Sequence, residues 1–228
     1  MRPGHDESPF NALPASVVVL ALFFFGVEMA LQLGARGLIG GPNAIGWRIA
    51  LMREFAVIPE LFRTLWEMGL WPLEHLLRLV LYPCVHGSFT QMVFVVVFVL
   101  ALGKLVGEQF GPWTVIAIFV GSSVLAALLY LLIVPGNQPL VGGFPGAYGL
   151  IGAYTFILWV FLGQLGQQQS RAFSLIGFLM AIQLVFGLLF GGGYEWIADL
   201  AGFAAGFALS IVLSPGGIAR IRDKLRQR

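Results

Sequence analysis

One stretch of the sequence, residues 109–170, contains no Asp, Glu, Lys, Arg or His over 62 consecutive positions. A helix needs about 20 apolar residues to cross the roughly 30 Å hydrocarbon core of a bilayer, so this stretch has room for two or three crossings. The segment 135–139 (Pro-Gly-Asn-Gln-Pro) interrupts it, because proline lacks the amide hydrogen and glycine loosens the backbone. We therefore predict two membrane spans here, over about 113–134 and 144–163.

The rest of the chain has the same character, since 58% of its 228 residues are hydrophobic and only 11% are charged. Soluble domains average about 45–50% apolar and about 25% charged residues. This composition excludes a soluble enzyme, a nucleic-acid-binding module and a disordered tail. Four further apolar runs predict spans over about 15–33, 87–107, 172–190 and 195–213. The expected fold is all-α: a polytopic membrane protein whose membrane domain, residues 13–213, is a bundle of six transmembrane helices.

A long segment, residues 34–80, separates the first two spans, and its Arg and Glu residues nearly balance. Apolar and charged residues alternate at helical spacing over 45–55 and 59–68, and three tryptophans in the segment suit the membrane interface. We predict short helices lying in the outer interface, with an ordinary structured loop as the alternative.

The positions of Lys and Arg predict the orientation of the chain. Residues 214–228 form a basic tail with five Lys or Arg and one Asp, which is expected to stay in the cytoplasm and can contact anionic membrane lipids. With six spans, the N-terminal tail 1–12 lies on the same side. The basic patch is too short to indicate a nucleic-acid partner.

Ionisable residues within or beside the spans are the first candidates for a functional site. Asp199 lies in the sixth span, one turn before Gly202, and the spacing of Gly202 and Gly206 favours close packing against another helix. Glu28 is near the outer end of the first span and is expected to be a solvated carboxylate. His86 precedes the second span, and we expect it to order the outer loop through a hydrogen bond.

Other kinds of site have little support in the sequence. Cys84 is the single cysteine, which excludes a disulfide within the chain and a cysteine-rich metal site. We expect no metal and no cofactor, and the sequence does not predict an oligomeric state.

Three motifs in this order resemble the rhomboid family of intramembrane serine proteases. Residues 86–89 (His-Gly-Ser-Phe) resemble the family's entry to the second span. Residues 142–154 align without gaps on the pattern Gly-x-Ser-Gly-x-x-(aromatic)-x-Leu-x-Gly, and 198–206 align on Ala-His-x-x-Gly-x-x-x-Gly. The resemblance covers about residues 12–213 and implies a rhomboid-like bundle with a large first loop in the outer leaflet.

The resemblance also implies catalytic positions that this chain fills with other residues. The family's nucleophilic serine falls on Phe144 and its general-base histidine on Asp199, while the two oxyanion-stabilising residues fall on Gln91 and Val95. Phenylalanine has no nucleophilic atom, and loss of the nucleophile removes a factor on the order of 10⁶ in rate. A competing register places Tyr148 on the serine position, and it supplies neither a serine nor a histidine.

The family's structural residues are retained, and they complete the candidate set: His86, Tyr148, Gly202, Gly206 and Arg78, the last resembling the arginine of a Trp-Arg pair in the first loop. From the family's arrangement we expect the Tyr148 hydroxyl to bond to the Asp199 carboxyl, and Phe144 to fill the volume that a protease keeps open. The alternative is a protonated Asp199 facing a polar cavity.

The resemblance thus implies a pseudoprotease that binds the transmembrane segments of client proteins. The compact six-span form, without the extra helix common in eukaryotic relatives, implies the inner membrane of a bacterium. A first alternative is an intramembrane serine endopeptidase that uses an unrecognised site. A small-solute transporter or channel ranks third, because Asp199 and Gln183 are the only deep polar groups we identify and no internal repeat is evident.

Overall fold

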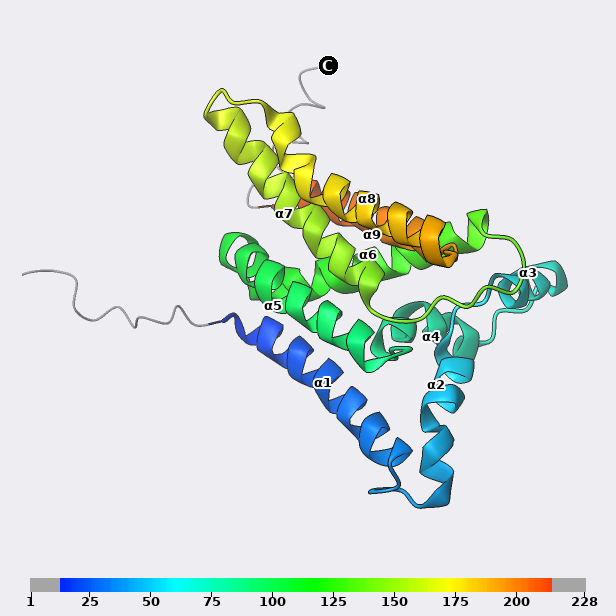
Figure 1. Ribbon diagram of the computed structural model, residues 1–228. Coiled ribbons are helices and arrows are strands. Elements are labelled where there is room, and N and C mark those ends of the chain that lie inside the picture. Colours follow the sequence, from blue (N-terminus) through cyan, green and yellow to red (C-terminus); the bar gives the residue numbers. More distant parts are fainter. Residues whose placement is uncertain (1–12, 215–228) are drawn as a thin grey trace, which may run out of the picture.

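Within the described residues, the structure has six helical spans that are long and apolar enough to cross a membrane (Figure 1). The fifth of them, Gln169–Leu189, joins the 3-10 helix η3 (Gln169–Phe173) to α8 (Ser174–Phe190). The computed structural model describes residues 13–214, so both predicted tails, 1–12 and 214–228, lie outside the described residues except for Ser214. The prediction of an all-α, multi-pass membrane protein is confirmed. The six helices are α1 (Ala15–Ala35), α5 (Phe89–Phe110), α6 (Pro112–Ile133), α7 (Phe144–Gln164), α8 (Ser174–Phe190) and α9 (Glu195–Leu213).

Glycine and proline set the turns between these helices. Gly111 has a φ of 98°, which a residue with a side chain rarely adopts, and Pro112 follows as the first residue of α6, where its missing amide hydrogen costs nothing.

A serine caps the start of α5. The Ser88 hydroxyl accepts a hydrogen bond from the Gln91 backbone amide at 3.1 Å, as a helix N-cap does.

The segment between α1 and α5 folds into short helices that gather at one end of the bundle (Figure 1). Two of them match the expected helical stretches, and α4 is a third beyond those expected. Their position relative to the membrane interface stays a prediction. The elements are η1 (Pro42–Gly46), α2 (Trp47–Phe55), α3 (Pro59–Met68), α4 (Leu73–Leu81) and η2 (Tyr82–Cys84).

Backbone hydrogen bonds tie this segment to the connection that leads into α7. Val57 and Leu140 exchange two bonds in an isolated antiparallel bridge, with N···O distances of 3.1 and 2.9 Å. The Gly142 amide donates to the Tyr82 carbonyl at 3.1 Å, and the Tyr82 hydroxyl donates to the Ser123 carbonyl of α6 at 2.9 Å. The connection that leads into α7 is therefore held by the segment between α1 and α5, which is itself bonded to α6.

Helix α7 is the most enclosed span, and it packs against α5, α6 and α9. Its contact with α9 brings the two backbones together. A Cβ atom added to Gly202 would collide with the Pro145 carbonyl oxygen, and one added to Gly206 would collide with the Gly149 carbonyl oxygen. Packing at this distance is possible only because these positions lack side chains.

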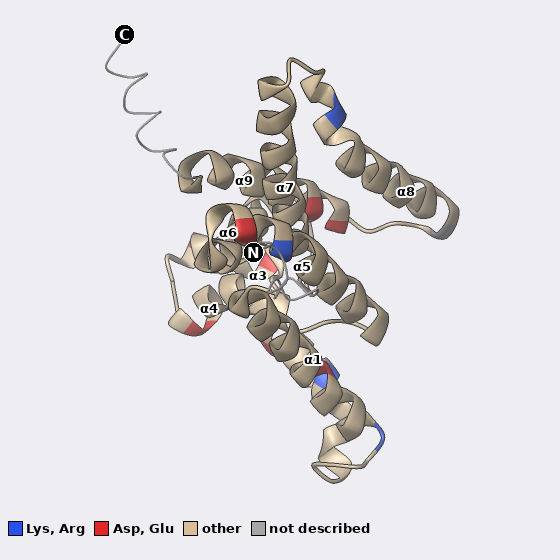
Figure 2. Cartoon of the chain, turned by 90° about the vertical axis from the view of Figure 1, so that its left-hand side faces the viewer, with Lys and Arg blue, Asp and Glu red and all other residues tan. Residues whose placement is uncertain are grey.

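Helix α8 is the least enclosed span. Residues in its first half, such as Ile176 and Met180, pack against the main core, but Leu184, Leu188 and Leu189 in its second half are 65–78% exposed. Seen from the side, α8 stands away from α7 and its neighbours (Figure 2).

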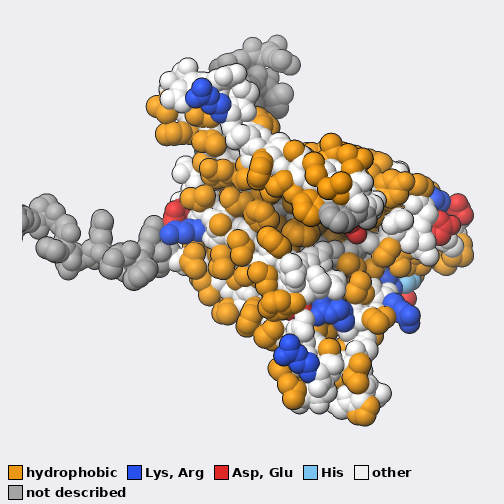
Figure 3. All heavy atoms as spheres, viewed as in Figure 1, with side chains coloured by type: hydrophobic (Ala, Val, Ile, Leu, Met, Phe, Trp, Pro, Cys, Tyr) orange, Lys and Arg blue, Asp and Glu red, His pale blue; other side chains and the backbone are white. Residues whose placement is uncertain are grey.

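The distribution of charge agrees with membrane insertion. Most of the length of the long helices is free of Lys, Arg, Asp and Glu (Figure 2). Hydrophobic side chains cover the middle of the molecule, while most charged ones lie towards its edges (Figure 3).

A glycine-to-alanine pair tests the contact between α7 and α9. We expect Gly206→Ala to lower the stability of the protein by about 1–3 kcal/mol or more, because the new methyl group meets backbone and cannot be accommodated by a side-chain rotation. Thermal unfolding in detergent measures this.

Gly177→Ala in α8 is the matched control, because nothing lies within 4 Å of its added Cβ. It should be neutral or slightly stabilising, since alanine favours helix by about 1 kcal/mol over glycine. Equal unfolding temperatures for the two variants would contradict the assigned packing.

Candidate functional site

A cavity of about 910 Å³ opens between the start of α5, the entry to α7, the second half of α8 and the start of α9. Phe144 and Asp199, the positions matched to the nucleophile and the base, both line it, and so does Gln91. Most other lining residues are apolar, including Met180 and Leu184 of α8. The structure therefore brings together three of the four positions that the sequence assigns to catalysis.

Asp199 is buried, with 3% of its surface exposed, and it is bonded to a residue of another helix. Its Oδ2 atom accepts a hydrogen bond of 2.7 Å from Nε2 of Gln183 on α8. Within the described residues no bond joins Asp199 to Tyr148, so the expected pair is wrong. Gln183 lies in the facing helix and its long side chain reaches the carboxylate, whereas Tyr148 packs edge-on against Phe144 with ring centroids 6.5 Å apart.

Phe144 is the first residue of α7, and its half-buried ring forms part of the cavity wall. The expectation that this ring fills the cavity is wrong, because the space beside it stays open. The reason is the position of α8, whose second half stands off from α7 and leaves more volume than one ring can occupy.

The two positions matched to the oxyanion residues differ in character. Gln91 braces the surrounding loops: its Oε1 accepts from the Gly87 amide at 2.8 Å, and its Nε2 donates to the Val141 carbonyl at 3.4 Å. Val95 is fully buried, lies close to Gly143 and has no polar atom in its side chain.

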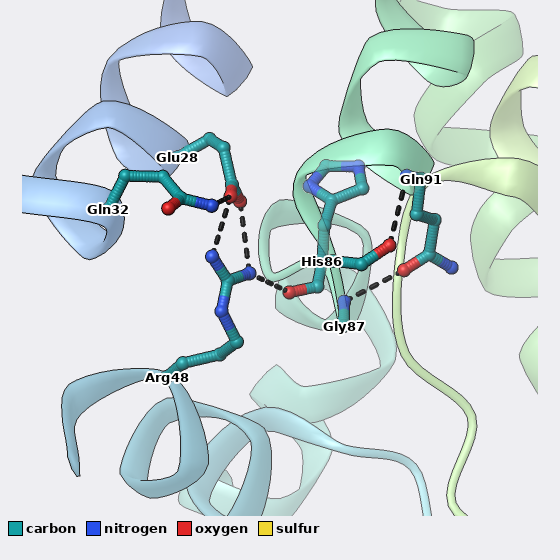
Figure 4. Close-up of polar contacts among 7 residues, drawn as sticks. Glu28, Gln32, Arg48, His86, Gly87 and Gln91 are labelled. Carbon is teal, nitrogen blue, oxygen red and sulfur yellow. Dashed lines mark hydrogen bonds and ion pairs between the residues drawn. The ribbon is translucent and has the colours of Figure 1, made fainter. Parts of the chain in front are cut away.

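His86 is also buried, but its side chain does not order the loop as expected. Its ring packs edge-on against Phe24 at 5.4 Å, and its Nε2 has no hydrogen-bond partner within the described residues. The backbone carbonyl of His86 makes the ordering bond instead, accepting from Nη1 of Arg48 at 2.6 Å (Figure 4). Burial lowers the pKa of His86 to about 4, a fall that Glu28 opposes and Arg48 assists.

Glu28 is 1% exposed, so the expectation of a solvated carboxylate is wrong. Arg48 of α2 binds it with two nitrogens, Nη2 to Oε1 at 2.6 Å and Nη1 to Oε2 at 3.1 Å (Figure 4). Gln32, one turn further along α1, donates to Oε1 at 3.0 Å. This cluster joins α1, α2 and the entry to α5, because a carboxylate away from water needs a paired cation.

Sequence reasoning missed this ion pair, although a signal was available. A glutamate inside an apolar span implies a partner, and Arg48 is among the nearest arginines after α1.

Arg78 stabilises the short helices at a distance from the cavity. Its Nη1 donates to the carbonyls of Arg53 and Ala56, each at 3.0 Å, and these oxygens lie at the end of α2. Its Nε donates to Nδ1 of His75 at 3.2 Å. A basic side chain on the last carbonyls of a helix is favourable.

The hydroxyl and thiol groups of the described residues are outside the cavity lining. Among the described residues that line it there is no Ser, Thr, Cys or His. Ser123 donates its hydroxyl to the Phe119 carbonyl at 2.8 Å, and Ser122 is buried in α6 against Gly149 of α7. Burial raises the pKa of Cys84 to about 11, so its thiol stays protonated at neutral pH. Within residues 13–214, no group of three His, Cys, Asp or Glu could hold a metal ion.

Two comparisons with known proteins agree with the motifs. The sequence model of the rhomboid domain matches residues 73–216, from α4 through all of α9. Rhomboid-like protease 3 of Toxoplasma gondii is 27% identical over 124 residues, which is 54% of this chain and 46% of that protein. The chain thus spans about half the length of this curated relative.

Two variants test the cluster around Glu28. We expect Arg48→Ala to destabilise the protein by about 3 kcal/mol, because it leaves a buried carboxylate without its cation. Arg63→Ala is the control: its pair with Glu60 is exposed at a distance of 3.6 Å, and such pairs contribute about 0–1 kcal/mol. Denaturant titration measures the free energy of unfolding of both variants. An equal loss of stability in the two would refute the buried ion pair.

The protonation of His86 predicts a loss of stability in acid. The folded state keeps this ring neutral down to about pH 4, while the unfolded chain has the ordinary value of 6.5. The unfolded state therefore binds more protons between these values, and stability falls as the pH is lowered from about 6.5 to 4, by at most about 3 kcal/mol. We expect His86→Phe to flatten the unfolding temperature over this range, and a slope that is unchanged from the wild type would refute the assignment.

Proposed function

Because this chain belongs to the rhomboid family, we propose that it is a pseudoprotease that binds transmembrane segments of client proteins in the open cavity without cleaving them. The observation that carries the proposal is the lining of that cavity. Phe144 stands at the start of α7, where the family pattern has its serine, and no hydroxyl or thiol side chain lines the cavity within the described residues.

Peptide-bond cleavage requires a nucleophilic atom, a base that accepts its proton and donors that stabilise the oxyanion. Asp199 is able to accept a proton, but its neighbour across the cavity is a benzyl ring. The amide of Gln91 is bonded to Gly87 and Val141, and Val95 has no polar atom to offer. This set of residues favours binding over hydrolysis.

The shape of the cavity supports a helical occupant. Its walls are mainly apolar, and the second half of α8, which forms one wall, has few contacts of its own. Helices in lipid associate through packing and through scattered polar contacts. A transmembrane segment that enters beside α8 would gain packing against the apolar walls and polar contacts with the cavity residues.

An intramembrane endopeptidase is the second candidate, and one observation favours it: the relative from Toxoplasma gondii is named a protease. Labelling of the purified protein by a fluorophosphonate probe, which modifies activated serines, would support this candidate over the first. A transporter or channel stays third, since the deep polar pair Asp199 and Gln183 forms no path in either direction through residues that the structure describes.

The cellular setting is part of the proposal. We place the chain in the inner membrane of a bacterium. We place both termini in the cytoplasm, because the distribution of Lys and Arg favours that orientation. Its partners are then client segments and membrane lipids, the latter contacting the basic tail. Reporter fusions to the two termini test the orientation.

Photocrosslinking tests client binding. We expect a photoreactive residue in place of Leu184, which lines the cavity, to capture a labelled single-span peptide of about 20 residues in reconstituted membranes. The mass of uncaptured peptide should stay unchanged, because no bond is cleaved. Leu132 on α6 is the control position, since it is 81% exposed but is not part of the cavity wall.

Equal capture from both positions would contradict a specific site. Shortened peptide would show hydrolysis and would replace the first candidate with the second.

A further inference from the structure

The charged side chains that line the cavity, within the described residues, are both acidic: Glu195 and Asp199. They lie four residues apart at the start of α9, so they occupy the same face of the helix, one turn apart. Glu195 is exposed and Asp199 is buried. The wall therefore carries one carboxylate near the surface and a second one deeper inside.

This arrangement is unfavourable without a further partner. Like charges at this helical spacing repel each other, and a carboxylate away from water costs free energy unless it is protonated or paired. The hydrogen bond from Gln183 satisfies one oxygen of Asp199 but brings no positive charge. Arg48, by contrast, is committed to Glu28 and lies on the opposite side of His86 from Gln91 (Figure 4).

The side-chain amides at the cavity leave one buried acceptor without a donor. One N–H of Gln183 is bonded to Asp199 and one N–H of Gln91 to Val141. The Oε1 of Gln183 is buried and has no hydrogen-bond partner within the described residues. This acceptor and the two carboxylates favour an occupant that brings hydrogen-bond donors and a positive charge.

We propose that the cavity selects transmembrane segments that carry a lysine side chain within about two turns of one end. This inference rests on the proposed function and names the class of client. The ammonium group has three donors, which match the carboxylates of Asp199 and Glu195 and the free Oε1 of Gln183. The aliphatic stem of lysine packs on the apolar walls, and Glu195 at the surface attracts the charge before it reaches Asp199.

The experiment uses the full chain in phosphatidylcholine nanodiscs and two labelled single-span peptides. The peptides are identical except for one position near the end, which is Lys in one and Leu in the other. We expect the Lys peptide to bind the wild-type protein at least tenfold more tightly, as measured by fluorescence anisotropy.

Three variants assign that preference to the acidic wall. Asp199→Asn keeps the size of the side chain and an oxygen for Gln183, and it should abolish the preference; Glu195→Gln should weaken it several-fold. Glu67→Gln, an exposed carboxylate on α3, should leave it unchanged. Thermal unfolding of each variant separates loss of binding from loss of fold.

The outcomes distinguish this inference from the proposed function. If both peptides bind the wild-type protein equally, the lysine selectivity is overturned and client binding stands. If neither peptide binds, both are overturned. If the preference disappears when phosphatidylethanolamine replaces phosphatidylcholine, a lipid amine occupies the acidic wall, and the inference of a lysine-bearing client is overturned.

Discussion

The close contact between α7 and α9 is the constraint on which the site depends. Gly202 lies directly against the Pro145 carbonyl, and Gly206 lies against that of Gly149. Because no side chain separates the two backbones, the first two turns of α7 are held beside the middle of α9. This contact brings Phe144 and Asp199 to one cavity, although 55 positions separate them in the sequence. The two positions that the family pattern gives to the nucleophile and the base thus line the same cavity.

Helix α8, unlike α7 and α9, is packed loosely against its neighbours. Its second half leaves large apolar side chains uncovered, and Gly177 has no atom within 4 Å of the position where a Cβ would stand. Gly177 therefore makes no close backbone contact of the kind that Gly202 and Gly206 make, and α8 stands away from α7 (Figure 2). The bond from Gln183 to Asp199 links this loosely packed half of α8 to the rigid core. A hydrogen bond to a charged group contributes about 1.5–3 kcal/mol, and this bond is the one side-chain hydrogen bond that ties this half of α8 to α9 among the described residues. The wall formed by α8 is therefore held less firmly than the contact of α7 with α9.

Hydropathy was sufficient to predict the six spans, and the resemblance to the rhomboid motifs singled out Phe144 and Asp199, which line one cavity. Each of those features depends on a local pattern or on a fixed motif spacing. The partners of the buried acids were not predictable in the same way. Gln183 reaches Asp199 because of where α8 stands, and Arg48 reaches Glu28 because α2 folds back beside α1. A carboxylate in a span indicates that a partner exists, but the sequence does not say which helix supplies it. For Asp199, the rhomboid family's arrangement suggested Tyr148, whereas the structure has Gln183 as the partner.

Comparison of the two buried carboxylates explains why we propose the cavity, and not the Glu28 cluster, as the place for a ligand. Glu28 and Asp199 are almost equally buried, at 1% and 3% exposed. Glu28 has an arginine bound through two nitrogens and a glutamine besides, so its charge is neutralised within the chain. Asp199 has one amide donor and a second carboxylate one turn away. Desolvation costs the two acids similar amounts, yet only Glu28 is compensated by a cation of the protein itself. The missing positive charge at Asp199 lies beside open volume, which is where a binding partner can supply it.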